Sequence, residues 1–247
     1  MSDEFDAVAA WTADAAVSLG ASYYIPAGCR GSGSPAALSW LVDALALTSS
    51  DRLLDVGAGV GGPAAFAAQS SSARPVLAEP EPGACRAARR LFGFPTVRAA
   101  AEALPFASGS FDVAWCLGVL CTTDDQPGVL AELRRVLAAG GHLGLLVFTV
   151  DRASNRPHPT GNHFPTAPAL RTMLRDAGFD IAASKEMSAF GPEPAGWRRQ
   201  VDMVDAELDR RHHDDESWQI AQRQSSTIGR LLEVGELTGS VLDLRAD

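Results

Sequence analysis

The stretch LLDVGAGVGGPA, residues 53–64, decides the fold that this sequence predicts. Its apolar beginning is typical of a buried strand, and Pro63 suits the first turn of a helix. Between them stand four glycines, at positions 57, 59, 61 and 62. Glycine has no side chain to keep other groups away, so a ligand can approach this backbone closely. The stretch therefore predicts a strand, a ligand-binding loop and a helix in succession.

Strands and helices alternate along the rest of the chain. We expect strands at 51–57, 74–80, 96–100, 111–118, 142–150, 180–187 and 239–247. We expect helices at 1–20, 37–47, from Pro63 onward, and at 82–93, 126–141 and 166–179, with 21–37 as a loop. Strands that alternate with helices build a parallel sheet, which binds ligands at the carboxyl ends of its strands. The sequence thus predicts an α/β fold with a Rossmann-like, doubly wound, mostly parallel seven-stranded sheet.

Composition divides the chain into a core and two helical additions. We expect residues 1–48 to form an N-terminal helical cap and residues 49–187 to form the Rossmann-like core. Residues 188–238 are polar and charged with helical spacing, and are predicted to be an insertion before the final core strand at 239–247. The helices at both ends are expected to form a lid over the sheet.

Charge and cysteine usage disfavour several classes of function. The 247 residues carry a formal net charge of −9, which disfavours nucleic acids and anionic membranes as partners. No apolar run approaches the ~18 residues of a membrane span, and the acidic beginning does not resemble a secretory signal. The four cysteines and five histidines show neither CxxC nor HExxH spacing, so we expect no metal site. These features favour a cytoplasmic protein with reduced thiols.

The glycine loop by itself is compatible with a dinucleotide. Gly57, Gly59 and Gly62 have G-x-G-x-x-G spacing, and Glu79 follows about 20 residues later, where a ribose-binding acid belongs. An NAD(P)-dependent oxidoreductase is therefore one alternative. Asp55 stands two residues before the first glycine. Its negative charge is unfavourable beside a pyrophosphate but favourable near an ammonium or a sulfonium.

Four segments in order favour a different ligand. They are LLDVGAGVGG, LAEPEPGACRAAR, AEALPFASGSFDVAWCLGVL and LRRVLAAGGHL, within about residues 50–150. With these segments the sequence resembles the class I S-adenosylmethionine-dependent methyltransferases, in the small-molecule branch. The resemblance implies S-adenosylmethionine as cofactor and methyl transfer to O, N or C of a metabolite or natural-product intermediate. A monomer or homodimer is expected.

The resemblance also implies cofactor-binding residues. Around the methionine part and the methyl group it places Asp55, Gly57, Ala58, Gly59, Cys116 and Leu117, with Tyr23 closing over the cofactor. Around the ribose and adenine it places Glu79, Pro80, Ala101 and Glu102. One position departs from the family pattern: Ala100 stands where similar proteins carry an aspartate bonded to adenine. This departure supports a second alternative, a catalytically quiet cofactor-binding protein.

The candidate catalytic residues lie in loops at the carboxyl ends of the strands. Methyl transfer from a sulfonium depends mainly on positioning, and a base is needed only when the acceptor arrives protonated. His163 and His158, in the loop after the fifth strand, are candidate bases, His163 first. Tyr24 is the third candidate, in a glycine-rich segment that can act as a lid. Asp124 and Asp125 can orient a cationic substrate, although Asp125 is better placed to cap a helix.

Overall fold

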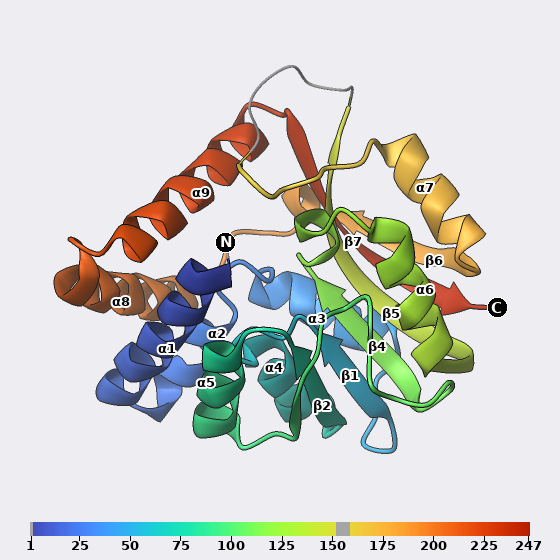
Figure 1. Cartoon of the computed structure of the whole chain (residues 1–247), viewed down its shortest axis with the longest axis horizontal. Coiled ribbons are helices and arrows are strands. Elements are labelled where there is room, and N and C mark those ends of the chain that lie inside the picture. Colours follow the sequence, from blue (N-terminus) through green and yellow to red (C-terminus); the bar gives the residue numbers. More distant parts are fainter. Residues whose placement is uncertain (1, 152–158) are drawn as a thin grey trace.

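The computed structural model describes residues 2–151 and 159–247, which contain one seven-stranded sheet (Figure 1). The strands are β1 (Arg52–Val56), β2 (Arg74–Glu79), β3 (Thr96–Arg98), β4 (Phe111–Leu117), β5 (Leu137–Val150), β6 (Phe179–Glu186) and β7 (Leu237–Ala246). They lie side by side in the order β3-β2-β1-β4-β5-β7-β6. Only β7 runs antiparallel to its neighbours among these strands. The predicted doubly wound, mostly parallel sheet is confirmed.

The helices of the described residues lie between the strands and at both ends of the chain. They are α1 (Ser2–Leu19), α2 (Tyr24–Gly28), α3 (Pro35–Ala44), α4 (Gly62–Ser71), α5 (Pro82–Phe92), α6 (Gln126–Val136), α7 (Ala167–Asp176), α8 (Ala195–His212) and α9 (Glu216–Glu233). Asp125 caps α6 by accepting the N–H of Gly128 at 3.0 Å, as its position in the sequence favoured. In the part of the chain that the structure describes, no helix is both long enough and apolar enough to cross a membrane.

Helices cover both faces of the sheet. On one face, α3 and α4 pack against Leu53 of β1 and Trp115 of β4. On the other face, α6 and α7 belong to the cluster that holds Leu54 and Cys116. Consecutive residues of a strand point to opposite faces, so strands buried on both sides are apolar at nearly every position. The buried part of β1 after the exposed Arg52 contains one polar residue, Asp55, at the end that meets the glycine loop.

The N-terminal helices and the late helices pack on one another. α1 contacts α5, α8 and α9, and α2 contacts α4 and α8. Figure 1 shows α1 between α5 and α8, and α9 running from the end of α8 towards the start of β7. The helices α1 and α2 and the late helices α8 and α9 thus form one group beside the carboxyl ends of β1 and β2, whereas α3, also within residues 1–48, packs on the sheet.

Three expected boundaries are wrong. The helix expected at 126–141 ends at Val136, because Leu137 takes an extended conformation and pairs with Phe111 of β4. Gly141 lies inside β5, where a Cβ would be 2.8 Å from the carbonyl oxygen of Asp112, so its glycine allows close strand packing and does not stop a helix. The loop expected at 21–37 contains α2, and the last strand begins at Leu237, two residues before position 239.

Candidate active site

The glycine loop between β1 and α4 is closed on two sides and open on a third. The N–H of Gly57 donates to the carbonyl oxygen of Ala78 at 2.8 Å, on the β2 side. A Cβ on Gly57 would lie 2.3 Å from a methyl carbon of Val119, so the segment after β4 touches the loop. Gly59 has a φ of +54°, and no atom lies within 4 Å of the position that its Cβ would take. The space beside Gly59 is therefore available to a ligand.

A backbone contact that the sequence did not predict joins this loop to α2. A Cβ on Gly62 would lie 2.2 Å from the carbonyl carbon of Gly28 and 2.5 Å from the nitrogen of Cys29. Any side chain at Gly62 or Gly28 would push the two backbones apart. In the sequence, this contact is marked only by Gly28 within YYIPAGCRG, residues 23–31. Two glycines far apart in the chain form no motif that could be recognised beforehand.

Asp55 is a buried carboxyl group at the end of β1. Its residue is 2% exposed, and its Oδ2 atom is buried without a hydrogen-bond partner in the structure. Burial raises the pKa of Asp55 to about 7, the nearby charge of Glu79 raises it as well, and a hydrogen bond from the backbone N–H of Ala64 lowers it. A buried carboxylate oxygen without a donor is costly, and a cation or an N–H group of a ligand would relieve that cost.

Glu79 ends β2 on the other side of the loop. Its Oε2 accepts the N–H of Gly59 at 2.8 Å, and its Oε1 accepts the N–H of Glu81 at 3.0 Å. Burial raises the pKa of Glu79, these two hydrogen bonds lower it, and the charges of Glu81 and Asp6 raise it. Asp6 comes from α1 and accepts the N–H of Gly83 at the start of α5. The N-terminal helix therefore reaches the edge of the site through Asp6, a residue that the sequence did not single out.

The other residues assigned to the cofactor lie around the same carboxyl ends. Ala58 in the loop and Cys116 and Leu117 at the end of β4 are buried, as is Ala101 after β3. Pro80 and Glu102 are exposed. The Oε1 atom of Glu102 accepts the hydroxyl of Thr123 at 2.5 Å, so the segment after β3 meets the segment after β4.

Cys116 does not supply a reactive thiolate. Its side chain is fully buried, and burial raises the pKa of the Cys116 thiol to about 12, with smaller contributions from nearby acidic groups. The thiolate is the reactive form of cysteine, and it is not formed at neutral pH here. Cys116 therefore contributes shape and not acid–base chemistry.

His163 and Asp124 form a pair near the loop after β4. The Nε2 atom of His163 lies 2.6 Å from Oδ1 of Asp124. The backbone N–H of His163 donates to the carbonyl oxygen of Cys121 at 2.8 Å, and its carbonyl accepts from Nε2 of Gln126 at 2.7 Å. The His163 side chain is about half exposed, at 49%, so the ring is accessible. Two residues that the sequence considered separately are thus brought together.

The two tyrosines make packing contacts with helices. The hydroxyl of Tyr23 donates to Sδ of Met203 in α8 at 3.2 Å. The ring of Tyr24 meets that of Phe92 in α5 edge to face, with centroids 6.3 Å apart. His158, the second candidate base, lies outside the described residues.

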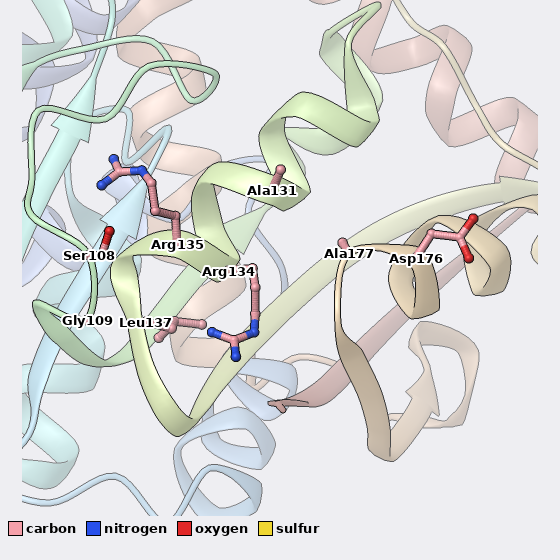
Figure 2. A pocket seen from close by; sticks show the side chains of 8 residues that line it. All are labelled: Ser108, Gly109, Ala131, Arg134, Arg135, Leu137, Asp176 and Ala177. Carbon is pink, nitrogen blue, oxygen red and sulfur yellow. The ribbon is translucent and has the colours of Figure 1, made fainter.

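A pocket of about 640 Å³ lies at the opposite edge of the sheet, near the amino ends of β4 and β5 (Figure 2). It is lined by Ser108, Gly109, Ala131, Arg134, Arg135, Leu137, Asp176 and Ala177. Arg135 donates to the carbonyl oxygens of Leu104 and Phe106 and is paired with Glu132. The guanidinium of Arg135 is thus engaged in holding the segment before β4. Ligands of such sheets bind at the opposite edge, so this pocket is not the candidate active site.

Known proteins resemble this chain in sequence and in fold. Residues 54–145 match a family model described as "Methyltransferase domain". "Methyltransferase GfsG" of Streptomyces halstedii is 31% identical over 112 residues, which are 42% of this chain and 40% of that protein. "Sarcosine/dimethylglycine N-methyltransferase" of Halorhodospira halochloris is 28% identical over 177 residues, 63% of this chain and 61% of the relative.

Solved structures share the whole architecture. The [4+2]-cyclase SpnF superimposes with a TM-score of 0.67 at 23% identity, over 85% of this chain and 79% of SpnF. Geranyl diphosphate C-methyltransferase from Streptomyces coelicolor A3(2), solved with S-adenosyl-L-homocysteine, gives a TM-score of 0.61 at 13% identity, over 85% and 75% of the two chains.

The sequence matches to curated proteins cover only part of each chain. An uncharacterised protein of Mycobacterium tuberculosis is 32% identical over 117 residues, which are 43% of this chain and 41% of that protein. The chain therefore aligns with about two fifths of the length of the first curated relatives. Residues 54–145 of the chain are therefore similar to a methyltransferase domain, and the chain shares its fold with the solved structures named above.

Proposed function

We propose that the protein is an S-adenosylmethionine-dependent methyltransferase that acts on a small molecule. The observation that carries this proposal is the pair of buried carboxyl groups, Asp55 and Glu79, at the strand ends next to the loop that contains Gly59. Both lie at the carboxyl ends of adjacent parallel strands, where such folds bind their ligands.

The charges of this site fit S-adenosylmethionine better than a dinucleotide. Two buried carboxyl groups make a negative environment that favours a ligand with an ammonium and a sulfonium and opposes a pyrophosphate. The unpartnered Oδ2 of Asp55 would accept from the ammonium, which would hold this carboxyl group ionised. The Glu79 carboxylate would exchange its bond to the Gly59 N–H for the two ribose hydroxyls.

The remaining assigned residues would complete the cofactor site. Gly57, Ala58 and Gly59 would line the methionine part, and Cys116 and Leu117 would form the floor. Pro80 would pack on the adenine ring, with Ala101 and Glu102 at its edge and Tyr23 in the segment that covers it.

When bound, the cofactor supplies a methyl group on a sulfonium, which is already a good leaving group. The protein then has to align the acceptor atom and exclude water, and buried walls such as Leu117 serve both purposes. His163 would take the proton of an acceptor that arrives as a hydroxyl or an ammonium. Because Nε2 of His163 lies beside Asp124, Nδ1 is the ring nitrogen left to accept that proton. Tyr24 and His158 stay predictions as further catalytic residues.

Several features support a small acceptor and a cytoplasmic setting. By their names, relatives and structural neighbours act on sarcosine, dimethylglycine and geranyl diphosphate, all small molecules. The net charge of −9 opposes binding of nucleic acid. The four cysteines are buried free thiols, as expected in a reducing compartment. The protein would act as a monomer or a homodimer.

One alternative keeps a specific observation in its favour. Ala100 lacks the carboxylate that similar proteins direct at adenine, which supports a protein that binds the cofactor without transferring its methyl group. The NAD(P)-dependent oxidoreductase has no comparable support, because it leaves the negative environment around Asp55 unexplained.

Calorimetric titration tests these functions. We expect S-adenosylhomocysteine to bind with micromolar affinity and NADH not to bind. Glu79→Gln should weaken the binding, whereas Asp180→Asn, an exposed carboxyl of β6, should leave it unchanged. Binding of NADH alone would overturn the proposal. Transfer of a radiolabelled methyl group to components of a metabolite extract then separates an enzyme from a quiet binder.

A further inference from the structure

Arg30 connects three helices of the N-terminal and late groups at one point. Its Nη2 atom lies 2.7 Å from Oδ1 of Asp205 in α8. Its Nη1 donates to the hydroxyl of Thr12 in α1 at 3.3 Å. Its guanidinium lies 5.6 Å from the ring centre of Trp218 in α9, a cation–π contact. The side chain thus holds α1, α8 and α9 together.

This arginine is largely removed from water. Its side chain is 24% exposed, Trp218 is 1% exposed, and burial lowers the pKa of Arg30 while the charge of Asp205 raises it. Burial also raises the pKa of Asp205, and Arg30 lowers it. Asp205 is the more open member of the pair, with a side chain 40% exposed, so its removal leaves the largely covered guanidinium of Arg30 without a charge partner.

The backbone of Arg30 is tied to the glycine loop. Arg30 stands two residues after Gly28, whose backbone touches that of Gly62, and the nitrogen of Cys29 lies 2.5 Å from the position of a Gly62 Cβ. Pro26, Ala27 and Gly28 of α2 are buried. Only Cys29, whose backbone also lies close to Gly62, stands between Gly28 and Arg30, so a shift that moves the backbone of Arg30 would reach the glycine loop directly.

We infer that Arg30 is a positioning residue that couples the late helices α8 and α9 to the cofactor loop. Movement of these helices changes the shape of the glycine loop through α2, and binding at the loop in turn stabilises the packed helices. The inference rests on the proposed function only in naming the ligand of the loop, because the contacts themselves belong to the ligand-free chain.

A comparison with Arg210 of α8 shows why Arg30 differs. Arg210 pairs with Glu207 three residues earlier in the same helix, and its side chain is 66% exposed. It joins no second element through this pair. Arg210→Gln is therefore a matched control that removes an arginine and an ion pair without touching the connection to the loop.

Calorimetry with S-adenosylhomocysteine tests the coupling. We expect Arg30→Gln and Asp205→Asn each to weaken binding roughly tenfold, the range in which coupled sites act. The double variant should bind S-adenosylhomocysteine no more weakly than the single variant with the lower affinity, since both substitutions break the same ion pair. Arg210→Gln should bind as the unchanged protein does. A fall in melting temperature with unchanged affinity in both single variants would overturn the inference.

Amide hydrogen exchange of the ligand-free protein gives a second readout. In Arg30→Gln, peptides that contain residues 57–62 should exchange faster together with peptides of α8 and α9, and in Arg210→Gln they should not. Faster exchange confined to α8 and α9 would also overturn the inference. If Arg30→Gln does not fold, Asp205→Asn and Arg30→Lys take its place. If the unchanged protein binds no S-adenosylhomocysteine, the proposed function fails, and the exchange data still decide the coupling.

Discussion

Substitution of Asp55 by asparagine should stabilise the ligand-free protein in a way that depends on pH. The carboxyl group is buried with Oδ2 unpartnered, and its pKa is raised from 3.8 to about 7. The unfolded chain therefore releases this proton at lower pH than the folded protein does. As the pH rises from about 4 to about 7, the folded state loses stability relative to the unfolded state. Asparagine keeps an oxygen for the Ala64 N–H and cannot ionise.

The magnitude follows from the difference between the two pKa values. Each pH unit between about 4 and about 7 costs the wild-type protein ~1.4 kcal/mol, so the difference of about three units amounts to about 4 kcal/mol. We expect Asp55→Asn to have no advantage from this source below pH 4. Its free energy of unfolding should exceed that of the wild type increasingly up to pH 7 and by a constant amount above it.

Urea unfolding of both proteins at pH 4, 5, 6, 7 and 8 measures this difference. Asp180→Asn, at an exposed position of β6, is the control and should show no comparable rise. A difference between Asp55→Asn and the wild type that is constant from pH 4 to pH 8 would refute the reasoning, since it would mean that Asp55 does not titrate in this range. The same variant should bind S-adenosylmethionine more weakly, because it no longer faces the ammonium with a charge.

Three further substitutions probe the loop and the proposed chemistry. Gly62→Ala places a methyl group 2.2 Å from the carbonyl carbon of Gly28, and urea unfolding should show a loss of ~3 kcal/mol. In Gly59→Ala the new methyl group meets no atom of the ligand-free protein, so the free energy of unfolding should fall by only ~1 kcal/mol because of the φ of +54°. Calorimetry should nevertheless show weaker binding of S-adenosylhomocysteine. Unchanged binding would mean that the ligand does not use this space. His163→Gln should lower kcat by ~10²–10⁴ for a protonated acceptor and leave the affinity for S-adenosylhomocysteine unchanged, and an unchanged kcat would exclude His163 as the base.

Local patterns along the chain predicted most of the fold. Apolar runs bounded by glycine and proline placed the strands, because burial on both faces requires apolar residues at consecutive positions. The loop with Gly57, Gly59 and Gly62 and the acids Asp55 and Glu79 could be placed together at one edge of the sheet, since these residues lie within one strand–helix–strand unit. That a ligand binds there stays a prediction. Errors arose where tertiary contacts outweigh local signals, as at Gly141, whose glycine serves strand packing.

The sequence by itself determined the sheet and brought the glycine loop, Asp55 and Glu79 to the ends of β1 and β2. Only the tertiary structure decided that Gly28 lies on Gly62, that His163 meets Asp124, and that Arg30 joins three helices to the loop. The physical reason is the range of the interactions. Strand patterns and the glycine loop reflect the backbone geometry of neighbouring residues, whereas these contacts join segments far apart in the chain, and they form only when the core has brought those segments together.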